Sequence, residues 1–430
     1  MEKQYKESGF DWIGKIPESW EVDIAKHVFK QRRDKGNDEC QLLAATQKYG
    51  MYPQHLLEGV VKVAADTDLN QFKTVHKNDY VISLRSFQGG FEMSDYEGVC
   101  SPAYQVFYAT RQIGSQYYKY LFKSDAFIQE INSLTVGIRE GKNILYDDFA
   151  LLPIPIPTVS DQQRIADYLD EKCGEIDSLI GLQEQMIEKL KAYKQSVITE
   201  AVTKGLNPNA KLVPSGIDWI GDIPQGWKVC KIKTIVAFIE SGVSVNAGNI
   251  PAKELEIGVL KTSSVSKFAF NPDENKTVND NEIGKVACPV RANTIIVSRM
   301  NTPELVGACG YVEKDYDNLF LPDRLWQVHF RNQENVKFIW FALCSAYIRN
   351  YYSSLSVGSS SSMQNISQDQ FANAKIVIPP LSEQQTISNY LDGKCSEIDK
   401  LIAMKQQKIE KLKDYKKSVI YEAVTGKIIV

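Results

Sequence analysis

The sequence lacks the short motifs that bind phosphates, cofactors or metals. It has no GxxxxGK[ST] phosphate loop, no glycine-rich cofactor turn after a strand, and no Asp- or Asn-Pro-Pro-aromatic tetrapeptide. The eight cysteines include no CxxC pair, and the four histidines are not paired with one another. These absences argue against a stand-alone enzyme, a zinc site and a disulfide framework.

Long apolar runs and an excess of charge of one sign are also missing. The longest apolar run, 338–348, is too short to span a bilayer, and the polar start MEKQYKESGF does not resemble a signal peptide. Net charge is −3, with 43% hydrophobic and 24% charged residues, as in ordinary globular proteins of two to four domains. We therefore expect a cytoplasmic, reducing location and no membrane association. Any nucleic-acid binding must come from local polar loops or be shared with a partner.

One stretch of the chain occurs twice. Residues 160–203 return at 382–425 with an offset of 222 and no gap, and 29 of the 44 aligned positions are identical. The first copy contains no proline, and most of its residues favour helix. Ser160 with Gln163, and Ser382 with Gln385, suggest capping boxes at the two helix starts. We expect two long helices, with Gly174 and Gly181 as possible sites of a bend.

Apolar residues in each copy follow the three–four spacing of a coiled-coil seam. The alternative is an amphipathic helix lying on a globular core. Two copies of one seam in one chain can pair with each other, and an intramolecular pair closes more readily if it is antiparallel. The predicted seam residues are Ile165, Leu169, Cys173, Ile176, Ile180, Ile187, Leu190 and Val197, with Ile387, Leu391, Cys395, Ile398, Ile402, Ile409, Leu412 and Val419 in the second copy.

A shorter repeat opens each half of the chain. SGFDWIGKIPESWEV at 8–22 returns as SGIDWIGDIPQGWKV at 215–229, and we interpret both as structural straps. Between straps and helices, short strand-like runs alternate with turn-rich loops. We expect an α+β (α/β) fold in which two long antiparallel coiled-coil helices separate two similar globular domains, with an internal pseudo-two-fold repeat. The predicted segments are 1–157, 158–207, 208–379 and 380–430, in the order domain, helix, domain, helix.

Some loops of the two domains differ in sequence although the residues that flank them match. SLTVG at 133–137 matches SLSVG at 354–358, yet IREGK follows the first and SSSSMQ lies in the corresponding loop of the second. RSFQGGF at 85–91 follows a strand-like run in the first half, and SRMNTPEL at 298–305 takes its place in the second. Arg, Gln and Asn side chains make bidentate contacts to base edges in the major groove, so these loops are candidate DNA readers. The alternative is a hairpin loop with solvated polar residues.

The whole arrangement resembles the specificity subunit of a type I restriction–modification system. The resemblance covers essentially the whole chain. It depends on the order of straps, domains and helices, and on particular words: IPESWEV and IPQGWKV, LPIPIPTVSDQQRIADYLD and IVIPPLSEQQTISNYLD, SRMNTPELVG and NLFLPDRLW.

The resemblance implies a sequence-specific DNA-binding subunit that is not itself catalytic. Each domain would be a target-recognition domain that reads one half of a bipartite double-stranded site through the major groove, and the helices would set the spacer. The helices would also dock two modification (methyltransferase) subunits, and motor–nuclease restriction subunits would join them. This chain would need no cofactor of its own, because S-adenosylmethionine, ATP and Mg would be bound only by the partner subunits.

In this family the DNA-reading residues are on variable loops, so candidates can be named by position. In the first domain the candidates are Thr46, Gln47, Arg85, Gln88, Arg139 and Lys142. In the second domain they are Arg299, Asn301, Ser360 and Gln364. Arg85, Gln88, Arg299 and Asn301 are predicted base readers, and Lys142 is a predicted phosphate contact.

Two other functional classes compete with this interpretation. The first is a non-catalytic adaptor or scaffold, with two similar domains joined by a coiled coil and binding protein or glycan. Salt-dependent retention on duplex DNA would distinguish DNA binding from this alternative. The second is a stand-alone enzyme, which the missing motifs disfavour.

Overall fold

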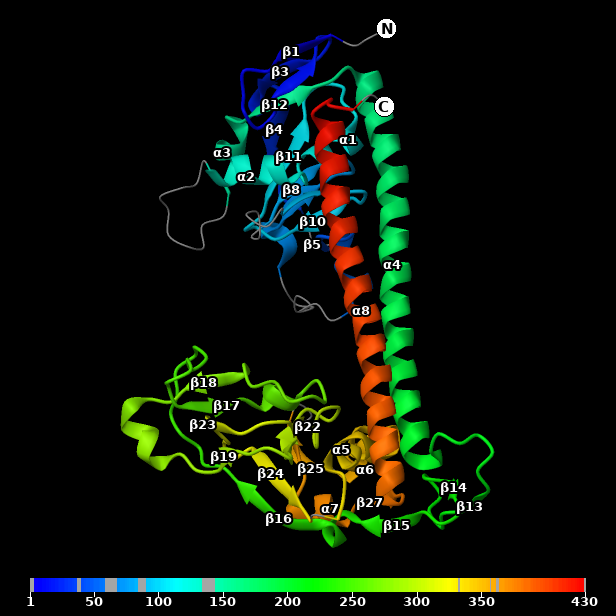
Figure 1. Ribbon diagram of the computed structural model, residues 1–430. Helices are drawn as coiled ribbons and strands as arrows, with labels where there is room; N and C mark the ends of the chain where they lie inside the picture. The colour runs from blue at the N-terminus through cyan, green and yellow to red at the C-terminus, as the bar shows by residue number, and fades with distance from the viewer. Residues whose placement is uncertain are drawn as a thin grey trace. The chain divides into compact units, whose positions relative to one another are not determined.

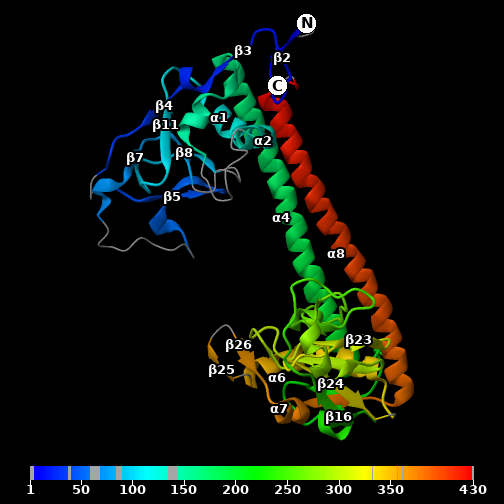
Figure 2. The ribbon, with the colours of Figure 1, turned by 90° about the vertical axis from the view of Figure 1, so that its left-hand side faces the viewer.

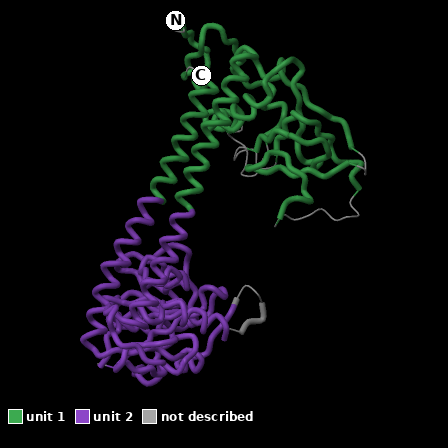
Figure 3. Tube along the Cα trace, turned by 90° about the vertical axis from the view of Figure 1, so that its right-hand side faces the viewer, with its two compact units in different colours: residues 1–184, 406–430 green, residues 185–405 purple. Residues whose placement is uncertain are grey.

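The structure is a computed structural model that describes residues 4–36, 40–58, 68–83, 90–133, 144–331, 333–355, 357–360 and 363–428. The chain divides into two compact units (Figure 3). Unit 1 comprises Met1–Glu184 with Gln406–Val430, and unit 2 comprises Gln185–Lys405. Each unit therefore contains one globular domain and part of each repeated segment.

The repeated segments form two continuous helices, α4 (Val159–Lys204) and α8 (Leu381–Val424). The predicted N-caps at Ser160 and Ser382 are wrong, because α4 begins at Val159 and α8 at Leu381, so both serines lie inside the helices. At α4 the capping residue is Thr158, whose hydroxyl oxygen accepts a hydrogen bond from the Asp161 backbone N–H at 3.1 Å. Glycines with positive φ follow the two helix ends, Gly205 at +74° and Gly426 at +72°, as expected for glycine C-caps.

The predicted seam is confirmed. Both interpretations of the helices, a coiled coil and an amphipathic helix lying on a core, apply to different parts of them. All predicted seam residues are buried or half-buried. Within each unit the two helices lie side by side and antiparallel (Figure 1). At their ends they also pack on the domain cores: Ile165, Leu169 and Val419 join the core of unit 1, and Ile387 and Leu391 that of unit 2. The helices thus form a coiled coil whose ends are also amphipathic helices lying on a core.

Both domains are built on a four-stranded antiparallel sheet with the same topology. In unit 1 the order is β4–β11–β8–β9, and in unit 2 it is β16–β24–β20–β22. The unit 1 strands are Phe29–Arg32, Gln105–Ala109, Tyr80–Ile82 and Phe91–Met93. The unit 2 strands are Val236–Ser241, Leu325–Phe330, Thr294–Ser298 and Cys309–Val312.

Short helices and strand pairs complete each domain in matching order. In unit 1 they are α1 (Ser115–Leu121), α2 (Asp125–Ser133) and α3 (Tyr146–Ala150), with the pairs β1 (Tyr5–Glu7) and β2 (Lys15–Pro17), and β3 (Glu21–Ile24) and β12 (Pro153–Ile156). In unit 2 they are α5 (Val336–Cys344), α6 (Ala346–Leu355) and α7 (Gln368–Asn373), with β13 (Leu212–Pro214) and β14 (Asp222–Pro224), and β15 (Lys228–Lys231) and β27 (Lys375–Ile378).

Smaller sheets extend the domains and differ between them. Unit 1 has the hairpin β5 (Leu43–Thr46) and β6 (Gly50–Pro53), and the pair β7 (Lys73–Val75) and β10 (Gly98–Cys100). Unit 2 has the sheet β18 (Asn275–Thr277), β17 (Gly258–Leu260), β23 (Tyr316–Phe320) and β19 (Pro289–Val290).

The repeated words of the sequence are explained by repeated contacts. The Trp20 indole N–H donates to Asp161 at 3.2 Å, and the Trp227 indole N–H donates to Glu383 at 3.0 Å. Each strap is thereby fastened to the first turn of the helix that follows its domain. Gly205 lies against Trp227 in the same way that Gly426 lies against Trp20.

The second residue of each helix-opening Asp/Glu-Gln-Gln word is also a structural anchor. Gln162 is 1% exposed; its side chain accepts from the Gly114 backbone N–H at 2.6 Å and donates to the Pro157 carbonyl at 2.8 Å. Gln384, also 1% exposed, accepts from the Asn335 backbone N–H and donates to the Pro379 carbonyl, both at 2.9 Å. The predicted fold of two similar domains and two antiparallel helices is therefore confirmed, and the two domains also share these hydrogen bonds.

Candidate nucleic-acid interface

Two distant segments of the second domain meet in one small sheet. Its strands are β21 (Met300–Asn301), β26 (Met363–Asn365) and β25 (Val357–Ser360), in that order. We call them the tip sheet. Figure 2 shows β26 and β25 side by side. Asn301 pairs with Gln364, Ser360 pairs with Met363, and Arg299 immediately precedes β21. All four candidate residues of the second domain therefore lie on or beside this sheet.

The loop that carries Arg299 and Asn301 is closed at its base. The Gly307 backbone N–H, from a residue with φ of +71°, donates to the Ser298 carbonyl at 2.7 Å. The Arg299 carbonyl accepts from the Ile366 N–H at 3.0 Å, which fixes the loop to the segment after β26. The Asn301 side-chain oxygen accepts from the Thr302 N–H at 2.9 Å, so it supports the loop's own turn in this structure.

Several polar atoms around the tip sheet are buried without a hydrogen-bond partner among the described residues. They are Arg299 Nε, Asn365 Oδ1 and Arg349 Nη1, the last of these on α6. A buried polar group without a partner costs about 1–3 kcal/mol. Half of the six such atoms in the described part of the chain lie in this region, so the tip sheet is held at an energetic cost.

In the first domain, the structure places Thr46 and Gln47 at the turn between β5 and β6. The Thr46 hydroxyl accepts from the Tyr49 N–H at 2.9 Å and donates to the Gly50 carbonyl at 3.0 Å. Thr46 thus shapes the turn, while Gln47 is exposed beside it. The remaining first-domain candidates, Arg85, Gln88, Arg139 and Lys142, lie outside the described residues.

An aromatic cluster lies behind the same turn. Tyr49 is 48% exposed, its ring centroid is 5.0 Å from that of Tyr52, and Tyr52 lies 5.5 Å from Tyr96. Lys48 Nζ lies 4.9 Å from the centre of the Tyr49 ring. Exposed aromatic rings with a nearby cation are suited to contacts with sugars, phosphates and bases. Tyr96 could not be predicted from the sequence as a member of this cluster, because it comes from a separate loop after β9.

Not every basic side chain is available to a ligand. Arg32 forms a two-pronged contact with Asp79, at 2.7 Å from Nε and 3.1 Å from Nη2. Burial alone would lower the pKa of Arg32, but the hydrogen bonds and charge of Asp79 and then Asp34 outweigh it and raise that pKa. Arg32 is therefore a structural arginine.

The helices carry a second candidate surface, which is repeated. In unit 1, Leu179 and Leu182 of α4 are 44% and 53% exposed, and Tyr415 of α8 is 52% exposed. In unit 2 the residues at the equivalent positions are Leu401 and Met404 of α8, 46% and 65% exposed, and Tyr193 of α4, 50% exposed. Large apolar side chains are therefore exposed at the same helix positions in both units.

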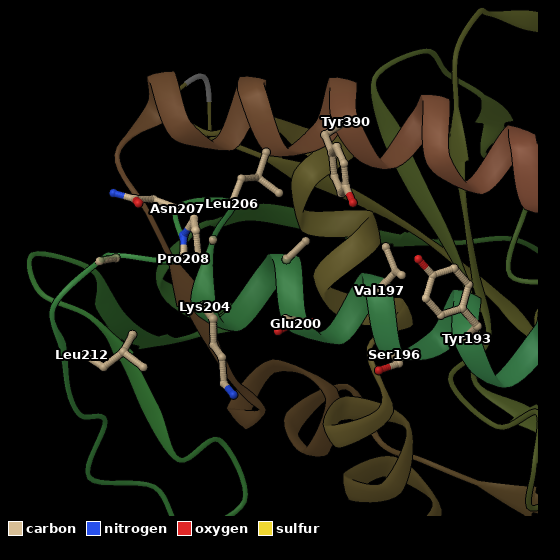
Figure 4. A pocket seen from close by; sticks show the side chains of 13 residues that line it. Tyr193, Ser196, Val197, Glu200, Lys204, Leu206, Asn207, Pro208, Leu212 and Tyr390 are labelled. Carbon is tan, nitrogen blue, oxygen red and sulfur yellow. The ribbon is translucent and has the colours of Figure 1, made fainter.

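A groove in unit 2 includes one residue of this surface. It has a volume of about 480 Å³ and lies between the last turns of α4, the segment from Gly205 to Leu212, and α8. Figure 4 shows Tyr390 of α8 reaching toward Val197 and Tyr193 of α4. Glu200 and Lys204 add one acidic and one basic group to its wall. A groove along a helix with mixed apolar and charged walls suits a peptide segment of a partner.

No metal site or membrane span is found among the residues the structure describes. No group of three or more His, Cys, Asp or Glu side chains there is arranged to hold a metal ion. In the same residues, no helix combines the length and the apolar composition needed to cross a bilayer.

Comparison with known proteins identifies the family. The family model described as Type I restriction modification DNA specificity domain matches residues 18–192 and 224–414. The chain therefore belongs to this family and contains the domain twice. It is a type I restriction–modification specificity subunit, a class of protein that recognises DNA sequence.

Named relatives extend over most or all of the chain. It is 25% identical over 444 residues to the type I restriction enzyme MjaVIII specificity subunit of Methanocaldococcus jannaschii, covering 99% of this chain and 97% of the relative. It is also 25% identical over 324 residues to the EcoKI specificity subunit of Escherichia coli strain K12, covering 74% and 66%.

Solved structures share the fold. A chain from work on complex assembly and conformational transition of the type I R-M system superposes with a TM-score of 0.70 at 15% identity, covering 96% of this chain and 99% of that one. The HsdS subunit from Thermoanaerobacter tengcongensis gives a TM-score of 0.50 at 15% identity, covering 96% and 98%.

Proposed function

We propose that this chain is the non-catalytic DNA-reading subunit of a type I restriction–modification complex. Each domain reads one half of a bipartite site in double-stranded DNA through the major groove. The paired helices fix the unspecified spacer between the half-sites. Half-sites read on one face of a duplex are about 34–36 Å apart for each helical turn. A helix of 46 residues, roughly 69 Å long at ~1.5 Å per residue, is long enough to span that spacing.

The observation that carries this proposal is the tip sheet of the second domain. Arg299, Asn301, Ser360 and Gln364 come from two segments far apart in sequence, and they meet on and beside three very short strands. Arg, Asn and Gln are the side chains that form paired hydrogen bonds with guanine and adenine. Such residues gathered at the variable tip of a repeated frame suit a reader of one particular half-site.

The repeated helix surface supports two copies of one partner. We assign Leu179, Leu182 and Tyr415 to one docking site, and Leu401, Met404 and Tyr193 to the other. The partner is the modification (methyltransferase) subunit, and the Figure 4 groove would take one of its peptide segments. S-adenosylmethionine, ATP and Mg belong to the modification and motor–nuclease subunits. The complex acts on DNA in the cytoplasm.

Single-molecule methylation sequencing tests this function. The sample is DNA from cells that express this chain with its matched modification subunit. The controls are the modification subunit alone and a chain in which residues 249–371 are replaced by those of a different family member. A split methyladenine motif that requires this chain, and that changes in only one half on replacement, is the expected result. A stable complex that yields no motif would refute the proposal and favour a coiled-coil scaffold.

A further inference from the structure

Arg349 is an arginine on the inner face of α6 that no carboxylate neutralises among the described residues. Its Nη2 donates to the Glu304 backbone carbonyl at 2.8 Å, in the loop that carries Arg299 and Asn301. Its guanidinium carbon lies 4.6 Å from the centre of the Phe268 ring, and its Nη1 is buried without a partner in the described structure. Burial lowers the pKa of Arg349.

We infer that Arg349 is a positioning residue for sequence reading by the second domain, and this inference rests on the proposed function. The guanidinium holds the 298–307 loop in the conformation that presents Arg299 and Asn301 to DNA. Arg349 itself does not touch DNA, because its free N–H is buried.

α6 contacts the loop that contains β21, and the chain continues from α6 into β25. A Cβ added to Gly307, where the loop closes, would lie 3.3 Å from Arg349 Nη1 and 2.8 Å from a ring carbon of Tyr352. The other side of the sheet, β25, begins two residues after α6 ends at Leu355. One helix therefore contacts the segment that follows β21 and leads directly into β25.

The energetic cost of this arrangement indicates a role other than stability. An apolar side chain of similar length would fill the same space without leaving a buried N–H unpaired. Phe268, on which the guanidinium rests, has a φ of +56°, a conformation rarely adopted by an aromatic residue. Buried unpartnered groups and backbone strain of this kind are retained where a particular geometry is needed.

Arg349 belongs to the second domain alone. Ser124 and Ser345 occupy equivalent positions, since each hydroxyl donates to the carbonyl three residues earlier, at 2.7 and 2.5 Å. The SLTVG and SLSVG words keep the same offset of 221, so the counterpart of Arg349 is Ile128. The tryptophan and glutamine hydrogen bonds described above occur in both domains. The hydrogen bond from Arg349 to the Glu304 carbonyl has no counterpart, because Ile128 has no side-chain donor. Its effect is therefore confined to the half-site read by the second domain.

The experiment compares binding of the complete complex to matched duplexes. Arg349→Met removes the donors and keeps the length of the side chain, Arg349→Gln keeps one neutral donor, and Ile128→Met is the control at the equivalent position. The duplexes carry the full site or a single base change in either half-site. The second half-site is the one whose motif changes when residues 249–371 are replaced. Thermal unfolding of each variant is recorded alongside.

Arg349→Met is expected to lose roughly tenfold in discrimination at the second half-site, comparable to one good base contact. Discrimination at the first half-site should stay within about twofold, and Ile128→Met should match the wild type. Arg349→Gln should fall between the two, and it decides the question if the Met variant does not fold. Unchanged discrimination in a folded variant, or equal loss at both half-sites, would overturn the inference. A wild-type complex that shows no discrimination would instead overturn the proposed function on which it rests.

Discussion

Lys194 and Asp399 form in unit 2 the same ion pair that Lys416 and Asp177 form in unit 1. Each lysine donates to both carboxylate oxygens of its partner, at 2.8 and 2.7 Å in the first pair and 2.7 Å twice in the second. The two ion pairs are related by the internal repeat, because Lys194 and Lys416, and likewise Asp177 and Asp399, are 222 residues apart. The two helices therefore pair in one antiparallel register, fixed by the same contact at two places.

Reversing one of these pairs tests the register. Lys194→Asp alone should lower the free energy of unfolding by no more than about 1 kcal/mol, because both groups are partly exposed. Combined with Asp399→Lys, the reversal should restore most of that loss. Denaturant unfolding of the two single variants and the double variant gives the coupling energy. A double variant as unstable as the sum of the singles would contradict the register.

The buried glutamines that open each helix should matter far more than their neighbours. Gln162→Ala leaves the Gly114 N–H and the Pro157 carbonyl without their partner, so we expect a loss of about 1–3 kcal/mol. Gln384→Ala should have a similar effect in the second domain. Gln163→Ala is the matched control, because the Gln163 side chain donates to Asp167 on the exposed face of the same helix. Equal destabilisation by Gln162→Ala and Gln163→Ala would argue against the anchor role.

Acid should weaken the attachment of the first strap. Burial alone would raise the pKa of Asp161, but hydrogen bonds from Arg164, Thr158 and Trp20 outweigh it and lower that pKa. A carboxyl group with a lowered pKa in the folded state stabilises the protein above its unfolded pKa of about 3.9, and that stabilisation is lost as pH falls below it. In Asp161→Asn the free energy of unfolding should therefore fall less steeply below about pH 5 than in the wild type. Identical pH profiles for the two proteins would contradict this assignment.

Arg299 is the sharpest test of base reading in the second domain. If Arg299 reads a guanine, Arg299→Ala should cost about 1–3 kcal/mol in binding and relax one base position of the methylation motif. Motif sequencing and competition binding measure the two effects, with the first half-site as internal control. A variant with unchanged motif and unchanged affinity would remove Arg299 from the set of readers.

The two docking surfaces should lose their partners one at a time. A lysine in place of Leu182 or Met404 puts a charge into an apolar contact. Each single variant should therefore bind one modification subunit less than the wild type, and the double variant should bind none. Native mass spectrometry of the assembled complexes gives the stoichiometry. Full assembly of the double variant would place the docking site elsewhere.

The sequence predicted the frame well because the frame is repeated and long. The seam could be identified because apolar spacing persists over 44 positions and recurs with an offset of 222. The predicted N-cap of the first helix was two residues too late because Thr158 and Ser160 are both good capping residues, and only Thr158 lies outside the helix with its hydroxyl on the Asp161 N–H.

The candidate site could be predicted only in part. Arg299 and Gln364 stand out as polar residues in loops, but their convergence depends on pairing between β21 and β26, strands of two and three residues. Strands that short show no periodicity in the sequence. Arg349 looks like an ordinary helix residue, and only its place on the same face as the buried Tyr352, or its alignment with Ile128, could have drawn attention to it.

The core of the first domain includes Val419, Ala423 and Val424, from the far end of the chain. On a ribosome that adds about 5–20 residues per second, the segment after Leu169 needs roughly 13–50 s to reach these residues. Until then the nascent first domain has an unfilled apolar face, which only the end of the second helix can cover. We expect chaperones to hold it during this interval, and proteases to remove chains that stop before the second helix is made.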